Sequence, residues 1–530
     1  MPQSLDTDVL IVGAGPTGLM LANQLGRHSV RTMIVDRHAG PSTQTRALGV
    51  QARTMEIYSK LGLADRALEL GKRAIGANLW SQGRKTARIP LGDIGQTESP
   101  FPFLLILGQD DNERILGERL RDWGMAVQWN TELVALEQQH DHAMATLKQP
   151  DGRTRKVKAA WVAGCDGARS AVRRFNGIDF VGEPYPHVFF VADVQMAGGM
   201  VPDELNVFFW RRGFHLLFPM RGAGHWRLVG ILPPALRERE GLSFEDLAPS
   251  VHSQTGARLS IQSCSWFSVY RIQHRCAARF REQRCFLLGD AAHIHSPVGA
   301  QGMNTGLQDA YNLGWKLALV VQGQANTGLL DSYEQERMPV ARRLLQTTDR
   351  AFQLVVSDSA LAALLRTQVL ARLAALAMRF ERVRRLVFLT VSQTGIAYRD
   401  SPLSSRSLSM FRRGPRPGER FPWLRLEFQA GAGMQDLFER LSDLNFNLLV
   451  FGQAAPAPDA LPFGERLASH TVAESGANQA ELKRSGIPRL SFYLLRPDGH
   501  IACCGLRLEV HAIHVCLGKF GLPRPSAALE

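Results

Sequence analysis

The first residues that could do chemistry form a glycine-rich turn near the start of the chain. The segment Gly13–Gly18 reads Gly-Ala-Gly-Pro-Thr-Gly and follows an apolar run, Asp8–Val12, that is typical of a buried parallel strand. Glycines let the backbone approach a pyrophosphate closely, and a helix over Leu19–Leu25 would direct its N-terminus at that group. We therefore expect a dinucleotide site that contains Gly13, Ala14, Gly15, Pro16, Thr17 and Gly18.

An acidic residue follows the second predicted strand. The strand over Arg31–Val35 ends at Asp36, which stands 18 residues after Gly18. At this distance a carboxylate can accept hydrogen bonds from both ribose hydroxyls of the bound nucleotide. Arg37 comes next and belongs to the same adenosine site. These residues predict a dinucleotide, but by themselves they do not distinguish FAD from NAD.

Two segments farther along the chain carry additional motifs. A predicted strand over Trp161–Cys165 leads into Asp166-Gly-Ala-Arg-Ser170 and then Arg173, the pattern Asp-Gly-x-x-Ser-x-x-Arg. Another strand, Arg284–Leu288, runs into Gly289-Asp290-Ala-Ala-His. We refer to residues 289–293 as the GD segment. A carboxylate at a strand end can bind a sugar hydroxyl, although Asp290 could also be the N-cap of a following helix.

The three motifs, in this order and at this separation, resemble those of the class A flavoprotein aromatic hydroxylases, the family of 4-hydroxybenzoate hydroxylase, phenol hydroxylase and the polyketide hydroxylases. The resemblance runs from residue 5 to about residue 340 and continues more weakly to the end, where longer members have a thioredoxin-like domain. It implies an α/β fold in which a Rossmann-like FAD-binding domain (1–75, 101–180 and 270–400, with long helices) is interleaved with a β-sheet substrate domain (76–100 and 181–269). A thioredoxin-like domain over 415–530 would follow.

The resemblance also assigns cofactor contacts. Asp166 would touch both flavin and nicotinamide nucleotide, Asp290 a ribityl hydroxyl, and the turn 299–304 the flavin, ahead of a helix that starts near Gly306. Surface or core roles remain open for Arg46, Gln109 and Val134. The positions that the family assigns to the cofactor beyond the first turn and Asp36 are Arg46, Gln109, Val134, Asp166, Gly289, Asp290, Pro297, Gly299, Gly302, Met303 and Asn304.

Few protein groups would act in the chemistry, because the flavin performs it. In this family FAD is reduced by NADPH or NADH and then reacts with O2 to form a C4a-hydroperoxide, which transfers one oxygen atom to an aromatic ring. Arg46 would help to set flavin mobility and Pro297 would shape the peroxide site. The family places a substrate contact near His215, although strand alternation could equally make it a structural histidine. Phe209 and Arg211 are lesser candidates.

Composition excludes several other classes of protein. The chain has 530 residues, of which 45% are hydrophobic and 21% charged, as in globular proteins. No apolar run approaches the roughly 20 residues that cross a bilayer, and no signal sequence is evident, so we expect a cytoplasmic protein without a transmembrane segment. The net charge of +13 is spread along the chain, which favours solvated faces over a nucleic-acid site. The seven cysteines have no metal spacing. A homodimer is compatible with the sequence.

Alternatives remain open at this point. A class A enzyme could instead catalyse Baeyer–Villiger oxidation or epoxidation with identical flavin motifs. A flavin-binding protein without turnover and a polyanion-binding protein are candidates of other classes. The C-terminal region has no redox Cys-x-x-Cys, so we assign it a structural role. The sequence does not reveal the aromatic substrate or whether NADPH or NADH is used.

Overall fold

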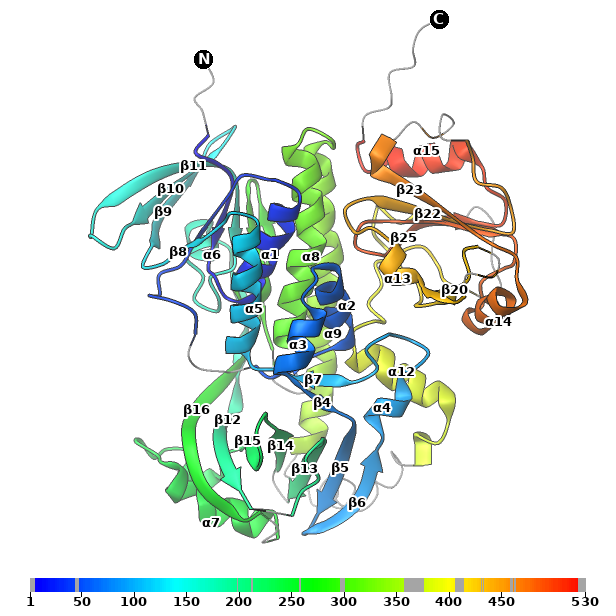
Figure 1. Ribbon diagram of the computed structural model, residues 1–530. Coiled ribbons are helices and arrows are strands. Elements are labelled where there is room, and N and C mark those ends of the chain that lie inside the picture. The colour runs from blue at the N-terminus through cyan, green and yellow to red at the C-terminus, as the bar shows by residue number, and fades with distance from the viewer. Residues whose placement is uncertain are drawn as a thin grey trace, which may run out of the picture.

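The structure is a computed structural model of the chain. It describes residues 5–42, 47–197, 199–210, 213–256, 259–295, 301–356, 376–405, 414–429, 431, 433–457, 461 and 464–522. Over these residues it has two eight-stranded sheets, a three-stranded sheet between them, and a four-stranded and a two-stranded sheet in the C-terminal region. Figure 1 shows the long helix α8 (Gly302–Val321) standing between the first sheet and the C-terminal region, with the second large sheet below. The chain is thus of the mixed α/β class.

The first large sheet carries the glycine-rich turn. Its central strands are parallel, and Val9–Val12 of β1 are at most 5% exposed because β2 and β11 flank them and helices cover the sheet. Helix α1 (Pro16–Arg27) packs against α5 (Gln109–Asp122) and α8. The strands in spatial order are β17 (Arg281–Glu282), β18 (Cys285–Leu287), β11 (Thr154–Gly164), β1 (Thr7–Val12), β2 (Thr32–Val35) and β8 (Val127–Gln128), with β10 (Ala143–Lys148) and β9 (Glu132–Gln138) attached to β11.

The second large sheet is mostly antiparallel. One of its faces is covered by α7 (Phe244–Gln254), and the two share a buried apolar cluster. Its edge strand β19 directly continues the GD segment, so the two large sheets meet there. The strands in spatial order are β19 (His293–Ile294), β16 (Ile261–Ala277), β12 (Phe180–Met196), β15 (His225–Ile231), β14 (Gly213–Pro219), β13 (Glu204–Trp210), β5 (Gly76–Ser81) and β6 (Arg84–Ile89).

A small sheet and several helices join the two large sheets. Leu48, Ala74 and Ile106 of the small sheet region pack against Leu205 and Phe218 of the second large sheet. The small sheet consists of β3 (Gly49–Val50), β7 (Leu104–Ile106) and β4 (Lys72–Ala74). The helices are α2 (Ala52–Lys60), α3 (Ala64–Leu70), α4 (Leu91–Ile94), α6 (Ala171–Phe175), α9 (Asp331–Val356) and α12 (Glu381–Val391).

The C-terminal region forms its own sheet beside α8 (Figure 1). Strand β22 (Phe446–Phe451) pairs in parallel with β23 (Leu467–Val472) and antiparallel with β24 (Ser491–Leu495), which pairs with β25 (Ile501–Gly505). The other elements are β20 (Arg425–Leu426), β21 (Gln435–Asp436), α13 (Leu437–Arg440), α14 (Gly476–Ser485) and α15 (Val510–Gly518).

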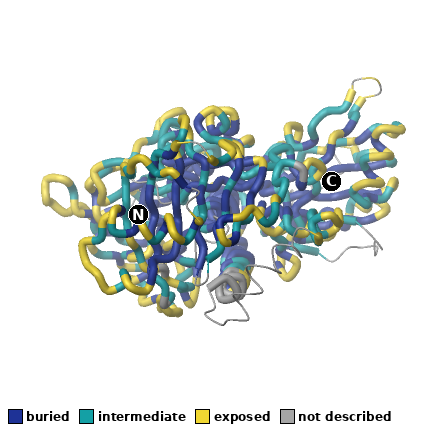
Figure 2. Tube along the Cα trace, turned by 90° about the horizontal axis from the view of Figure 1, so that it is seen from below, coloured by how far each residue is buried: buried dark blue, intermediate teal, exposed yellow. Residues whose placement is uncertain are grey.

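Burial follows this arrangement. Figure 2 shows buried residues concentrated in the interior of the molecule and exposed residues on its outer loops. None of the described helices is long and apolar enough to cross a membrane. The prediction that the helix after the GD segment starts near Gly306 is wrong by one turn, because the structure begins α8 at Gly302.

Candidate active site

The glycine-rich turn joins β1 to α1, and two of its glycines have no room for a side chain. Gly13 has a φ of +103°, and a Cβ there would lie 2.3 Å from the carbonyl oxygen of Cys165. A Cβ on Gly18 would lie 1.9 Å from the carbonyl oxygen of Gly13. Gly15 has no described atom within 4 Å of such a Cβ, so the N-terminus of α1 faces open space. The backbone N–H groups in the first turn of α1 are therefore accessible to an anion.

Asp36 lies at the end of β2, beside this turn. Its Oδ2 accepts a hydrogen bond from the Ala14 backbone at 2.7 Å, and its Oδ1 accepts one from the His38 backbone at 2.8 Å. The carboxylate is thus held at the edge of the turn. Arg37 is exposed. Val134, one of the cofactor candidates, is 37% exposed on β9, opposite a break in the β9–β10 register.

A residue that the sequence motifs did not reveal closes this end of the site. Glu113 on α5 accepts hydrogen bonds from the Ser42 backbone at 2.8 Å and from the Gln109 side chain at 2.9 Å. Burial raises the pKa of Glu113. The only sequence signal is its position four residues after Gln109, which puts both side chains on one face of the helix. Glu113 therefore fixes Gln109 at the start of α5.

Asp166 follows β11 and lies behind the same edge of the sheet. Its Oδ2 accepts hydrogen bonds from the backbones of Ala171 and Val172 at 2.6 and 3.2 Å, whereas its Oδ1 is buried and has no hydrogen-bond partner in the described chain. Burial raises the pKa of Asp166. Buried carboxylate oxygens are normally paired, so this oxygen could accept a hydrogen bond from a ligand.

Arg173 of the same motif links two parts of the site. Its guanidinium donates to the carbonyl oxygens of Ala291 at 2.8 Å and Ala168 at 2.7 Å, and it lies 3.8 Å from the centroid of the Phe180 ring. Burial lowers its pKa. Arg173 thereby holds the Asp166 loop against the GD segment.

The GD segment, the glycine-rich turn and α8 meet around one hydroxyl group. A Cβ on Gly289 would lie 2.7 Å from Thr17 Oγ1, and a Cβ on Gly306 would lie 2.4 Å from the same oxygen. Gly289 also has a φ of +56°, which favours glycine. The Asp290 side chain is exposed at the end of β18. Three segments far apart in the sequence are thus packed without space for any additional atom.

The first turn of α8 carries the last of the described cofactor candidates. Asn304 is fully buried, and its side chain bonds to the Gly49 carbonyl, the Gln51 backbone N–H and the Thr54 hydroxyl at 2.7 to 2.9 Å. Its side chain therefore anchors α2, which leaves the backbone for any cofactor contact. Gly302 begins the helix, and Met303 packs against the main core. The candidates Arg46, Arg211, Pro297 and Gly299 lie outside the described residues.

His215 is not in a substrate pocket, and its predicted substrate contact is corrected. The ring is fully buried, Nε2 lies 2.6 Å from the Gln254 side-chain oxygen on α7, and burial lowers the pKa of His215 to about 4. A Cβ on Gly230 would lie 2.1 Å from its Nδ1. Alternation along β14 turns this side chain to the face that α7 covers.

The opposite face of the second large sheet is lined by aromatic and aliphatic side chains. Phe218 and Leu205 on this face contact the small sheet, and the period of two along each strand places Leu216 and Phe209 on the same face. Helix α9 also packs against β14 and β16. The apolar cluster of this face comprises Phe189, Phe214 and Ile231, with Tyr185, Phe209, Leu216 and Tyr270 packed against it.

A cavity of about 310 Å³ opens where this face meets the small sheet. Arg227 and Asp193 line it as a bidentate ion pair with both distances 2.6 Å, and the Arg227 guanidinium lies 5.1 Å from the Trp266 ring centroid. Leu48 and Gly108 line its other side. The cavity therefore lies between the second large sheet and the small sheet region. Leu48, which lines it, comes two residues after Arg46 in the chain.

The donors and acceptors of this edge suit FAD. The open N-terminus of α1 could bind a diphosphate, Asp36 beside it could bind a ribose, and Asp166 Oδ1 is a buried acceptor farther along. Among the described residues no group of three or more His, Cys, Asp or Glu side chains could hold a metal ion.

Comparisons with known proteins agree with this donor set. Residues 6–348 match the family described as FAD binding domain. The chain is 35% identical over 523 residues to a 6-methylpretetramide 4-monooxygenase from Streptomyces rimosus, covering 96% of this chain and 92% of that protein. Two solved structures are similar over 98% of this chain with a TM-score of 0.79: an anhydrotetracycline hydroxylase from Streptomyces rimosus (27% identical, 100% of that chain covered) and an aklavinone-11 hydroxylase in complex with FAD and aklavinone (26% identical, 99% covered).

Proposed function

The chain belongs to the FAD binding domain family of FAD-dependent aromatic monooxygenases, and on that basis we propose that it hydroxylates a flat, polycyclic phenol. In the net reaction one oxygen atom of O2 enters the ring as a hydroxyl group and the other leaves as water. The two electrons come from NADPH or NADH, which leaves as NADP⁺ or NAD⁺. Bound FAD would supply hydride acceptance and oxygen activation.

The observation that carries the proposal is the continuity between the cofactor residues and the apolar sheet face. Strand β19 continues the GD segment without a break and pairs with β16 of the second large sheet. On the face opposite α7, the partly exposed side chains of Phe209, Leu216 and Tyr270 lie over a buried layer of Phe189, Phe214 and Ile231. Aromatic side chains of this kind bind fused rings well, since they bury large areas and favour stacked or edge contacts.

Two features favour a substrate with several fused rings. The chain is similar along almost its whole length to enzymes named for 6-methylpretetramide, anhydrotetracycline and aklavinone, all of which are multi-ring compounds. In addition, the cavity of about 310 Å³ at the rim of the apolar face leaves room beyond a single ring. We therefore favour a polycyclic phenol over a monocyclic one.

The residues of the chain have separate tasks in this proposal. The turn Gly13–Gly18 and α1 would bind the diphosphate, Asp36 the adenosine ribose, and Asp166 and Asp290 the flavin end. The apolar sheet face would orient the ring and exclude water, which in this chemistry protects the activated oxygen from loss. The Arg227–Asp193 pair would meet polar groups at the distal end of the substrate.

The remaining predictions about organisation also stay proposals. The strand order β23-β22-β24-β25, with one parallel and two antiparallel pairings, supports a thioredoxin-like domain over 415–530. The separate sheets support the division into FAD-binding, substrate and C-terminal regions. The homodimer and the cytoplasmic location remain predictions from sequence.

The first experiment is to purify the full chain, record its visible spectrum and follow NADPH and NADH oxidation in air. The panel contains phenol, 1-naphthol and a tetracyclic phenol. We expect flavin absorption, stimulation strongest with the tetracyclic compound, and a product heavier by one oxygen atom. Stimulation by phenol alone would contradict the proposed substrate size, and a lactone or epoxide product would replace hydroxylation by one of the alternative oxygenations.

A further inference from the structure

Asp309, on α8, holds both ends of the GD segment. Its Oδ2 accepts a hydrogen bond from the Gly289 backbone at 3.0 Å and lies 2.8 Å from His293 Nε2. The carboxylate is fully buried. Burial alone would raise the pKa of Asp309, but Arg337 and His293 outweigh it and lower that pKa. The position of Gly289 thus depends on where this carboxylate is held.

Arg337, on α9, fixes Asp309 from the other side. Its Nε donates to Asp309 Oδ1 at 2.6 Å, one terminal nitrogen donates to the Tyr398 hydroxyl at 3.0 Å, and the other donates to the Thr305 carbonyl at 3.1 Å. The guanidinium is fully buried. Since all three of its nitrogens are engaged, the orientation of Arg337 depends in part on Tyr398.

Tyr398 is held by a turn of the C-terminal region. The His500 ring lies 4.4 Å from the Tyr398 ring, centroid to centroid, and the Arg496 guanidinium lies 5.3 Å from the Tyr398 centroid. Arg496 also donates two hydrogen bonds to Glu336 at 2.5 and 2.9 Å, and Glu336 precedes Arg337 in α9. Asp498 accepts from Arg496 within the same turn. The turn 496–500 therefore contacts Tyr398, which bonds to Arg337, and Glu336, which precedes Arg337 in α9.

We propose that the C-terminal turn Arg496–His500 is a positioning element of the FAD site, which acts through Tyr398, Arg337 and Asp309 on the GD segment. We call this set of contacts the relay. The proposal rests on the placement of FAD against the GD segment. It gives the C-terminal region a role in cofactor binding although it contributes none of the cofactor candidates named above.

The free-energy cost of burying the charged side chains of the relay supports a specific role for them. Burying an ion pair costs several kcal/mol per ion before the attraction is counted, and an apolar interface would hold two domains together at least as well. Arg496, Glu336, Arg337 and Asp309 are all completely buried. A set of directional, fully paired charges fixes geometry more tightly than apolar contacts do.

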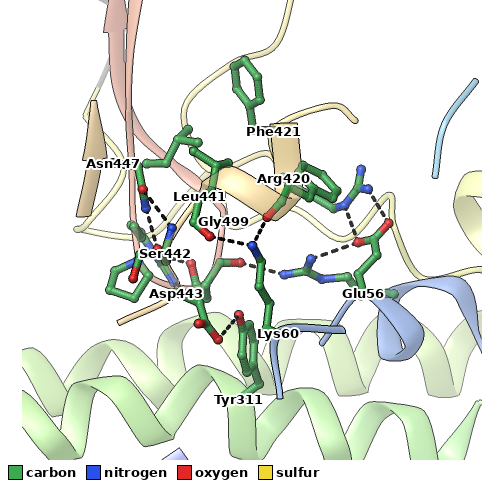
Figure 3. Close-up of a pocket in the computed structure, with 16 residues that line it drawn as sticks. Glu56, Lys60, Tyr311, Arg420, Phe421, Leu441, Ser442, Asp443, Asn447 and Gly499 are labelled. Atoms are coloured by element: carbon green, nitrogen blue, oxygen red, sulfur yellow. Dashed lines mark hydrogen bonds and ion pairs between the residues drawn. The ribbon is translucent and has the colours of Figure 1, made fainter. Parts of the chain in front are cut away.

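The same domain interface offers a matched control, Tyr311, which lines the same small cavity as Arg496 and Asp498 but whose hydroxyl bonds to a residue outside the relay. Tyr311 on α8 donates to Asp443 Oδ2 at 3.1 Å, and Asp443 also forms a bidentate pair with Arg27 at 2.7 Å. Figure 3 shows Tyr311 pointing to Asp443, with Lys60 directed at the carbonyl oxygen of Leu441 nearby. These contacts surround a cavity of about 40 Å³, too small for a cofactor. They dock the C-terminal region without reaching the GD segment.

The test compares Tyr398→Phe with Tyr311→Phe in the full chain. Each variant removes one buried hydroxyl at the interface, so we expect comparable losses in Tm. We expect the FAD Kd, measured by quenching of flavin fluorescence on titration with apoprotein, to rise roughly fivefold for Tyr398→Phe, equivalent to about 1 kcal/mol, and to stay unchanged for Tyr311→Phe. Equal Kd values for the two variants would overturn the relay.

A second measurement covers the case of poor folding and separates the two proposals. Asp309→Asn and Tyr398→Phe are combined in a double-mutant cycle on the FAD Kd, with the flavin midpoint potential recorded in each protein. We expect a double variant clearly less impaired than the product of the single effects, and a more positive potential for Asp309→Asn. Additive effects refute the relay. A wild-type protein that binds no FAD refutes instead the cofactor placement.

Discussion

Replacement of Gly306 by alanine is the sharpest steric test of the site. The added Cβ would lie 2.4 Å from Thr17 Oγ1 and 3.1 Å from Gly289 Cα, whereas ordinary van der Waals contact starts near 3.4 Å. The overlap with the hydroxyl is thus about 1 Å, and overpacking of this size costs about 1 to 3 kcal/mol. Alanine recovers about 1 kcal/mol in a helix interior relative to glycine. Because the overpacking cost exceeds this gain, we expect α8, the glycine-rich turn and the GD segment to move apart.

Removing the clashing atom should reverse the effect. In the double variant Thr17→Ala/Gly306→Ala the hydroxyl is absent. Of the two close contacts, only the one with Gly289 Cα at 3.1 Å remains. We expect Gly306→Ala to raise the FAD Kd about tenfold, equivalent to about 1.4 kcal/mol, and the double variant to recover most of that loss relative to Thr17→Ala alone.

The assay is titration of apoprotein with FAD for the four proteins of the cycle, together with their Tm values. Gly117→Ala is the control, since a Cβ at this helical glycine of α5 meets no described atom within 4 Å and should be neutral or slightly stabilising. If Gly306→Ala binds FAD as tightly as wild type, or if Thr17→Ala fails to relieve it, the packing argument is refuted.

Three further predictions concern single side chains. Asp166→Asn should raise the FAD Kd at least about tenfold with little change in apoprotein Tm, if the buried Oδ1, which has no partner in the described chain, accepts a hydrogen bond from the cofactor; unchanged affinity would contradict that role. Leu216→Trp should lower kcat/KM for a tetracyclic phenol more than for phenol while FAD content stays normal, and equal losses would remove Leu216 from the substrate face. Burial lowers the pKa of Lys316 to about 8, so the unfolded chain binds more protons between about pH 8 and 10.5 and stability rises with pH in that window, by up to about 3 kcal/mol. Lys316→Met should remove that rise in unfolding experiments across the window, and an unchanged pH profile would contradict the assignment.

The local motifs were strong enough to predict the cofactor edge of the fold. The strand, turn and helix around Gly13–Gly18 lie where the sequence predicts them, and so do the strands before Asp166 and Gly289. Each motif depends on contacts within a few residues, such as a strand that feeds a helix N-terminus. Family membership likewise followed from the order and spacing of three motifs.

The sequence could not reveal which side of a strand faces the site. His215 and Leu216 are neighbours on β14, yet only His215 faces α7, which forms about 30 residues later in the chain. Asn304 has the position of a cofactor residue, but its side chain is used by Gly49 and Thr54, more than 240 residues away. Such partners depend on long-range packing that no local pattern encodes.

The sequence by itself determined the cofactor, the reaction class and the strands that precede the cofactor motifs, because these depend on short motifs whose backbone geometry is local. Only the tertiary structure decided which face of the second large sheet lies opposite α7, that Glu113 bonds to Gln109 and Asp309 to the GD segment, and that Arg337 joins Asp309 to Tyr398. The physical reason is that buried polar groups take whichever partners the packed helices and sheets bring within hydrogen-bond distance, irrespective of their separation along the chain.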